Sequence, residues 1–145
     1  MKYRFIIPLV IISLLSFPSW SEPISENDLV QRGGLSYKKF TDIPFTGEVV
    51  YLYQGTLLEK KTYKDGKLDG PFISFHPNGQ LEFKVQYKDG KKHGLSVGYH
   101  PDGSIGYEGF WKQNSRDGLW KGFYSDGSID PNLTGIWEDG RKVND

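Results

Sequence analysis

Apolar and polar residues alternate along much of the chain, and this pattern predicts β-strands rather than helices. Leu81, Phe83, Val85 and Tyr87 alternate with three polar residues, which is the period-2 pattern of a strand that buries one face. The segments around residues 49–51, 73–75 and 97–99 share one apolar parity. Asn-Gly and Asp-Gly pairs separate the strands, and such pairs favour the positive φ angles of tight hairpins. A series of antiparallel β-hairpins is therefore expected.

The hairpins recur with a period of 24 residues, and several registers agree on it. The repeated positions are the aromatic series Tyr51, Phe75, Tyr99 and Phe123 and the glycine series Gly55, Gly79, Gly103 and Gly127. One hairpin alone is marginally stable in water, so neighbouring units must stack to bury their apolar faces. We predict an all-β fold, a single-layer twisted antiparallel β-meander of about four 24-residue hairpin repeats.

The period divides the chain into six segments. Residues 1–21 are a signal peptide, 22–45 a lead-in and cap, and the repeats are 46–69, 70–93, 94–117 and 118–142. In the lead-in, residues 29–30 and 35–37 suit an added edge strand. The last repeat, the C-terminal cap, has Pro131 in its expected second strand and Lys121 at a usually apolar position, features that we expect only at a sheet edge.

The apolar residues of the strands form the predicted core. Its expected members are Val49, Tyr51, Ile73, Phe75, Leu81, Phe83, Val85, Tyr87, Val97, Tyr99, Ile105, Tyr107 and Trp111. Fully burying one such side chain contributes about 1.5–3 kcal/mol. Truncation of a buried Phe75 or Tyr99 to alanine is therefore expected to cost about 3–5 kcal/mol.

The N-terminus predicts export. Two basic residues precede an apolar run at positions 5–17, and small residues at Ser19 and Ser21 suit a signal peptidase that cleaves after Ser21. The run is shorter than the roughly 20 residues of a spanning helix. No cysteine follows it, so a lipid-modified N-terminus and disulfides are both excluded. We expect a periplasmic or secreted protein.

Charge and motif content argue against several function classes. The chain has 18 basic and 18 acidic residues, without the concentrated positive charge that nucleic acid binding requires. His76 and His100 occupy the same turn position of successive units, about 9.5 Å apart at ordinary strand spacing, and nothing nearby completes a zinc site. The Asp-Gly turns recur with the period, which indicates backbone geometry rather than catalysis. We expect no enzyme activity, no metal and no cofactor.

Two sets of residues are candidates for partner binding. Large aromatic residues near the C-terminal end, Trp120 and Trp137, either contact a partner or complete the core. The lysines of the turns between units either form a solvated rim or attract an anionic surface. These lysines are Lys64, Lys67, Lys88, Lys91 and Lys92.

The units resemble the bacterial variant of the MORN repeat. The resemblance rests on residues 70–82 (GPFISFHPNGQLE) and 87–94 (YKDGKKHG) and extends over about residues 29–142. Asn114 and Ser115 depart from the pattern where the previous unit has Gly90 and Lys91. The resemblance implies a non-catalytic repeat that makes protein–protein contacts and sometimes binds phospholipid surfaces.

Together these features predict an exported scaffold for protein–protein interaction with an unidentified protein partner. Peripheral binding to an anionic membrane or glycan surface through the basic turns is the alternative. The sequence leaves the oligomeric state open.

Overall fold

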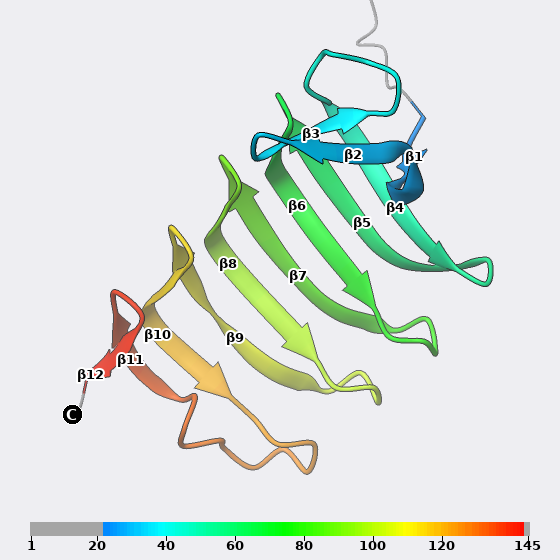
Figure 1. Ribbon diagram of the computed structural model, residues 1–145. Helices are drawn as coiled ribbons and strands as arrows, with labels where there is room; N and C mark the ends of the chain where they lie inside the picture. Colours follow the sequence, from blue (N-terminus) through cyan, green and yellow to red (C-terminus); the bar gives the residue numbers. More distant parts are fainter. Residues whose placement is uncertain (1–21, 144–145) are drawn as a thin grey trace, which may run out of the picture.

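The predicted all-β meander is confirmed. A computed structural model describes residues 22–143 and shows one open, twisted sheet of ten strands whose hairpins follow each other along the chain (Figure 1). The predicted signal peptide and its cleavage site lie at residues 1–21, outside the described residues. Within residues 22–143, no helix is long and apolar enough to cross a membrane.

Eight of the nine strands that follow the lead-in form four consecutive hairpins. They are β4 (Gly47–Tyr53) with β5 (Thr56–Lys64), β6 (Lys67–Phe75) with β7 (Leu81–Lys88), β8 (Lys91–Tyr99) with β9 (Ile105–Lys112), and β10 (Ser115–Gly122) with β11 (Gly135–Glu138). The ninth, β12 (Arg141–Val143), ends the sheet. Each of these strands pairs antiparallel with the next one.

The lead-in folds differently from the expected edge strand. Strand β1 (Ile24–Ser25) pairs parallel with β4, so the sheet is not antiparallel throughout. A 3-10 turn (Glu26–Asp28) leads to β2 (Leu29–Arg32) and β3 (Leu35–Lys38), which form a separate two-stranded sheet. The Gly33-Gly34 turn lets this segment pair with itself, and the amide of Ser36 then donates to Gly66 O at 2.8 Å.

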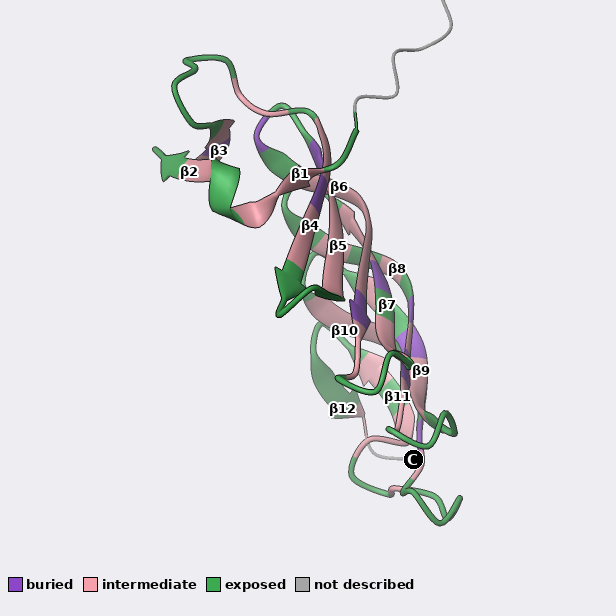
Figure 2. Cartoon of the chain, turned by 90° about the vertical axis from the view of Figure 1, so that its right-hand side faces the viewer, coloured by how far each residue is buried: buried purple, intermediate pink, exposed green. Residues whose placement is uncertain are grey.

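The large sheet has two unlike faces. We call the side that carries its buried side chains the core face and the other the open face. Pairing places one cross-strand row on the core face, which consists of Val49, Lys61, Phe72, Val85, Ser96 and Gly109. The ring of Trp120 covers Gly109, the last residue of this row. The row on the open face is Val50, Lys60, Ile73, Lys84, Val97, Glu108 and Lys121. Buried segments lie within the strands, whereas the turns are mostly exposed (Figure 2).

Rings lying flat on glycines allow a single-layer sheet to bury large side chains. A Cβ added to Gly98 would lie 2.1 Å from the Tyr107 ring, and one added to Gly109 would lie 2.2 Å from the Trp120 ring. Leu133 covers Gly122 in the same way, at 2.7 Å. Each of these glycines therefore provides the space in which a side chain from a later part of the chain packs against the backbone.

The residues predicted to form the core lie on both faces of the sheet. Val49 and Val85 are buried on the core face, but Ile73 and Val97 lie half-buried on the open face, and Ile105 is 44% exposed. Leu52 pairs with Leu57 as Phe75 pairs with Leu81, so the counterpart of Phe75 in the first hairpin is not Tyr51. The reason is that the first hairpin loop is one residue shorter than the loop between Phe75 and Leu81.

Two expectations about the last repeat were wrong. Pro131 does not lie inside a strand, because the chain leaves the sheet after β10 and returns only at Gly135. Lys121 is not at an edge, since β10 pairs with both β9 and β11. Its ammonium group instead forms an ion pair with Glu108 at 2.8 Å on the open face.

Hydrogen bonds between successive turns fix the spacing of the units. The amide of Gly66 donates to Phe45 O at 2.8 Å, that of Gly90 to Leu68 O at 2.7 Å, and that of Asn114 to Lys92 O at 3.0 Å. Asn114 adopts a φ of 71°, and its side-chain oxygen also accepts from the Lys92 amide at 2.7 Å. The junction with Asn114 and Ser115 is therefore regular, although its sequence departs from the repeat.

Candidate functional site

The tryptophans near the C-terminal end form part of the core. Trp120 is only 1% exposed, and its Nε1 donates to Phe110 O at 3.0 Å. Its ring stacks on Tyr107 at a centroid distance of 5.9 Å and meets Trp111 edge-on at 5.1 Å. Of the two roles open to Trp120, the structure therefore places it in the core, where it offers no contact surface.

Trp137 belongs to the same cluster but is half-buried. The guanidinium of Arg116 lies 4.5 Å from its ring centroid and 5.0 Å from that of Trp120. A cation at these distances is attracted by the ring quadrupole. Arg116 thus occupies the space between the indoles, and the cluster closes the C-terminal end of the core face.

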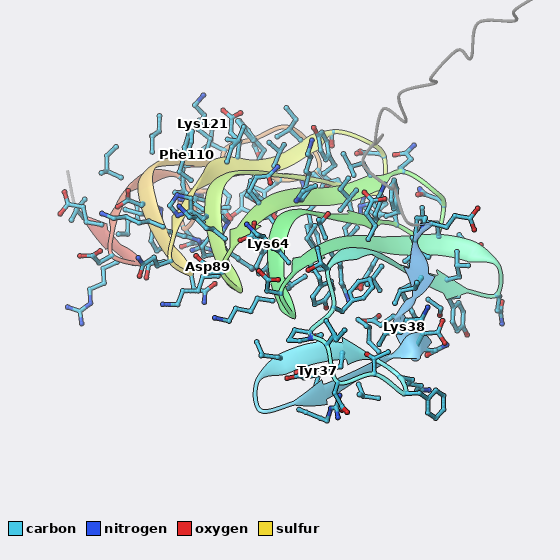
Figure 3. All side chains as sticks on the ribbon, turned by 90° about the horizontal axis from the view of Figure 1, so that it is seen from above. Tyr37, Lys38, Lys64, Asp89, Phe110 and Lys121 are labelled. Carbon is cyan, nitrogen blue, oxygen red and sulfur yellow. The ribbon has the colours of Figure 1, made fainter. Side chains whose placement is uncertain are left out.

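The five candidate lysines lie at one end of the strands, at the turns that join successive units, and we call this side of the sheet the lysine edge. Lys64 and Lys67 flank the Asp65-Gly66 turn, and the next two lysines flank the following turn in the same way. Four of the five are exposed, whereas Lys92 is half-buried with its ammonium group 4.6 Å above the Trp111 ring. None of the five takes part in an ion pair within residues 22–143. Figure 3 shows Lys64 and Asp89 at this edge.

An exposed apolar surface was not among the predicted sites. It lies on the open face and consists of Leu95, Phe110, Leu119 and Ile136, which are 40–52% exposed; we call it the apolar strip. Leu95 pairs with Phe110, and Leu119 pairs with Ile136, so the strip crosses β8 to β11. A groove of about 300 Å³ follows it, flanked by the Glu108–Lys121 ion pair. In Figure 3, Phe110 and Lys121 lie on the side of the sheet away from the β2–β3 hairpin.

A sequence signal for the apolar strip does exist. Three apolar residues each stand directly before a tryptophan, in Phe110-Trp111, Leu119-Trp120 and Ile136-Trp137. Adjacent side chains of a strand point to opposite faces. Because the tryptophans belong to the core face, their apolar neighbours must lie on the open face.

One charged side chain stands in the core row. The Lys61 side chain is 14% exposed and forms ion pairs with Glu26 at 2.7 Å and Glu59 at 2.6 Å. Burial opposes its charged form, but the hydrogen bonds and charges of the two glutamates outweigh burial and raise the pKa of Lys61 above its ordinary value. Glu26 comes from the 3-10 turn, so this network ties the lead-in to the first repeat.

The two turn histidines connect neighbouring units. His76 Nε2 lies 2.9 Å from Tyr99 O, and His100 Nε2 lies 2.9 Å from Phe123 O. A carbonyl oxygen only accepts hydrogen bonds, so each Nε2 carries the donated proton. These side chains therefore hold successive turns together at the other end of the strands, which we call the histidine edge.

Comparison with known families identifies the repeat. The family described as the MORN repeat variant matches residues 68–89, a segment that begins inside β6 and ends just after β7. The chain contains a MORN repeat. Its neighbouring hairpin β8–β9 has the same pairing scheme, with Gly98–Tyr107 and Tyr99–Ile105 in the places of Ser74–Phe83 and Phe75–Leu81. No curated protein matches the chain. The molecule is therefore a β-sheet of sequential hairpins, one of which, at residues 68–89, matches the MORN repeat variant.

Proposed function

We propose that this MORN-repeat protein is an exported, non-catalytic scaffold that binds a protein partner through the apolar strip. The observation that carries the proposal is the exposure of four large apolar side chains on neighbouring strands, with Phe110 52% exposed among them. Contiguous apolar surface rimmed by polar groups is characteristic of protein interaction sites. Here the Glu108–Lys121 ion pair supplies such a rim.

The rigidity of the sheet supports this proposal. Turn-to-turn hydrogen bonds run along both edges, so the strip is presented on a surface that is ordered before binding. A preordered surface loses less conformational entropy when a partner associates. The export part of the proposal rests on the N-terminal sequence alone.

Site-specific photocrosslinking in the producing cells tests the binding proposal. A photoreactive phenylalanine analogue replaces Phe110, and in the control it replaces Lys84, an exposed residue on the open face away from the strip. We expect a discrete protein adduct from position 110 that is absent from position 84 and disappears in a Leu119→Asp background. No adduct from position 110, or the same adducts from both positions, would contradict the proposal.

Peripheral binding to an anionic membrane or envelope polysaccharide through the lysine turns is the second candidate. It is favoured by the alignment of exposed, unpaired lysines along one edge of the described residues. Such attraction is screened by salt, with a Debye length of about 10 Å at 0.1 M. Cosedimentation with anionic vesicles at low salt that is lost at moderate salt, and weakened by Lys88→Gln with Lys91→Gln, supports it. Absence of cosedimentation at low salt excludes it.

A further inference from the structure

The edge with the histidines contains a second, chemically different site. A cleft of about 430 Å³ opens there between the turns of successive units. Its lining includes the aromatic rings Phe83, Tyr107 and Tyr124 and the carboxylates of Glu82 and Asp130. It is thus separate from the apolar strip on the open face and from the lysine edge.

The aromatic part of the cleft has a defined shape. The Tyr107 ring lies flat over Gly98, so close that a Cβ added to this glycine would be 2.1 Å from the ring. Phe83 pairs with Gly98, and Gly98 pairs with Tyr107, so the three residues lie side by side on the core face. The His76 and His100 hydrogen bonds hold the turns on either side. The cleft is therefore formed in the unbound protein.

The carboxylates of the cleft lack a counterion. Glu82 accepts a hydrogen bond from the hydroxyl of Ser74, a buried side chain. Asp130 accepts from the amide of Asn132 at 2.9 Å and from the Tyr124 hydroxyl at 3.3 Å. Neither carboxylate takes part in an ion pair within the described part of the chain. No described Lys or Arg lines the cleft.

We propose that this cleft binds the guanidinium group of an arginine side chain on a partner protein. Two uncompensated carboxylates favour a cation over an anionic or neutral group. Aromatic walls favour a flat, weakly hydrated cation, because guanidinium stacks on rings while its N–H groups donate to carboxylates. The proposed protein-binding role identifies the source of the arginine, but the site itself is testable without the partner.

A small matched pair of probes tests the site. Nα-acetyl-arginine amide carries the guanidinium, and Nα-acetyl-citrulline amide has nearly the same shape without the charge. Each is titrated into the purified ¹⁵N-labelled protein while the backbone amide signals of Gly98 and Gly106, both of which line the cleft, are followed. We expect saturable shifts with the arginine probe and at least roughly tenfold weaker binding of the citrulline probe.

Substitutions then assign the binding to the cleft. Glu82 on β7 and Asp130 beyond β10 have β8, β9 and β10 between them, so one small probe pairs with one of these carboxylates at a time. Glu82→Gln or Asp130→Asn should therefore weaken binding of the arginine probe about tenfold, whereas Glu138→Gln, at an exposed carboxylate at the opposite edge, should leave it unchanged. Absence of saturation, equal binding of both probes, or unchanged affinity in both cleft variants would overturn the inference. The probe comparison uses the unmodified protein, so it stands even if a variant fails to fold. A negative crosslink from position 110 would leave these results unaffected.

Discussion

The packing of Trp120 on Gly109 gives the sharpest stability prediction. In Gly109→Ala the new Cβ would lie 2.2 Å from Cδ2 of the indole, far inside van der Waals contact. The ring has little room to move, because it is 1% exposed and meets Tyr107 and Trp111. Overpacking of this kind costs about 1–3 kcal/mol. Loss of the Trp120 Nε1 hydrogen bond to Phe110 O adds about 1 kcal/mol, so we expect about 2–4 kcal/mol in total.

Gly106→Ala is the matched control. Gly106 is also a β9 glycine outside the left-handed region, but the nearest atoms to its new Cβ belong to the His100 ring at 3.3 Å. We expect its free energy of unfolding to change by less than about 1 kcal/mol. Urea unfolding followed by tryptophan fluorescence and circular dichroism gives both values from the midpoints when the slopes agree. Equal midpoints for the two variants would refute the role that we assign to Gly109.

Three further predictions concern the Lys61 network, the histidine edge and the regular junction. The raised pKa of Lys61 means that its ion pairs stabilise the fold fully below its ordinary pKa of 10.5 and are lost as the pH rises through the higher folded value. The urea midpoint should therefore decrease as the pH rises above 10.5, and it should decrease less steeply in Lys61→Met. His100→Ala removes a hydrogen bond to the next turn and should cost about 1 kcal/mol in thermal unfolding, whereas His93→Ala, at an exposed position, should have no effect; similar melting temperatures would count against the turn contact. Asn114→Ala and Asn114→Gly both remove the side-chain acceptor, but only alanine is strained at a φ of 71°, so alanine should be less stable by about 1 kcal/mol in urea unfolding. Equal stability of these last two variants would show that the backbone conformation does not matter there.

The sequence was sufficient for the hairpins and their order, because local alternation and Asp-Gly turns determine both. It was not sufficient for the assignment of faces. Tyr51 and Phe75 share a residue class and a 24-residue spacing, yet the shorter first loop moves Leu52 into the place of Phe75. A shift of one residue transfers a whole strand's side chains to the other face, which explains why Ile73 was assigned to the wrong side.

Non-local contacts account for the candidate sites that the sequence missed. Lys61 occupies a core position because Glu26, from the folded lead-in, and Glu59, from its own strand, both pair with it, and periodicity within the repeats contains no trace of Glu26. The cleft joins Glu82 and Asp130 from different repeats, so no single unit shows it. The apolar strip, in contrast, was accessible from the three apolar residues that precede tryptophans.

The overlap of rings and glycines across strands also constrains how such a chain lengthens or shortens. Trp120 needs a residue without a Cβ at position 109, and Leu133 needs one at position 122. A duplication or deletion inside the strands keeps these partners matched only if it involves a whole unit, whereas extra residues in a loop leave the match intact. The segment 130–134 illustrates the second case, since it lengthens the last unit outside the strands and still supplies Leu133. Variation in this protein is therefore expected to accumulate as whole repeats or as longer loops at the histidine edge, where the cleft lies.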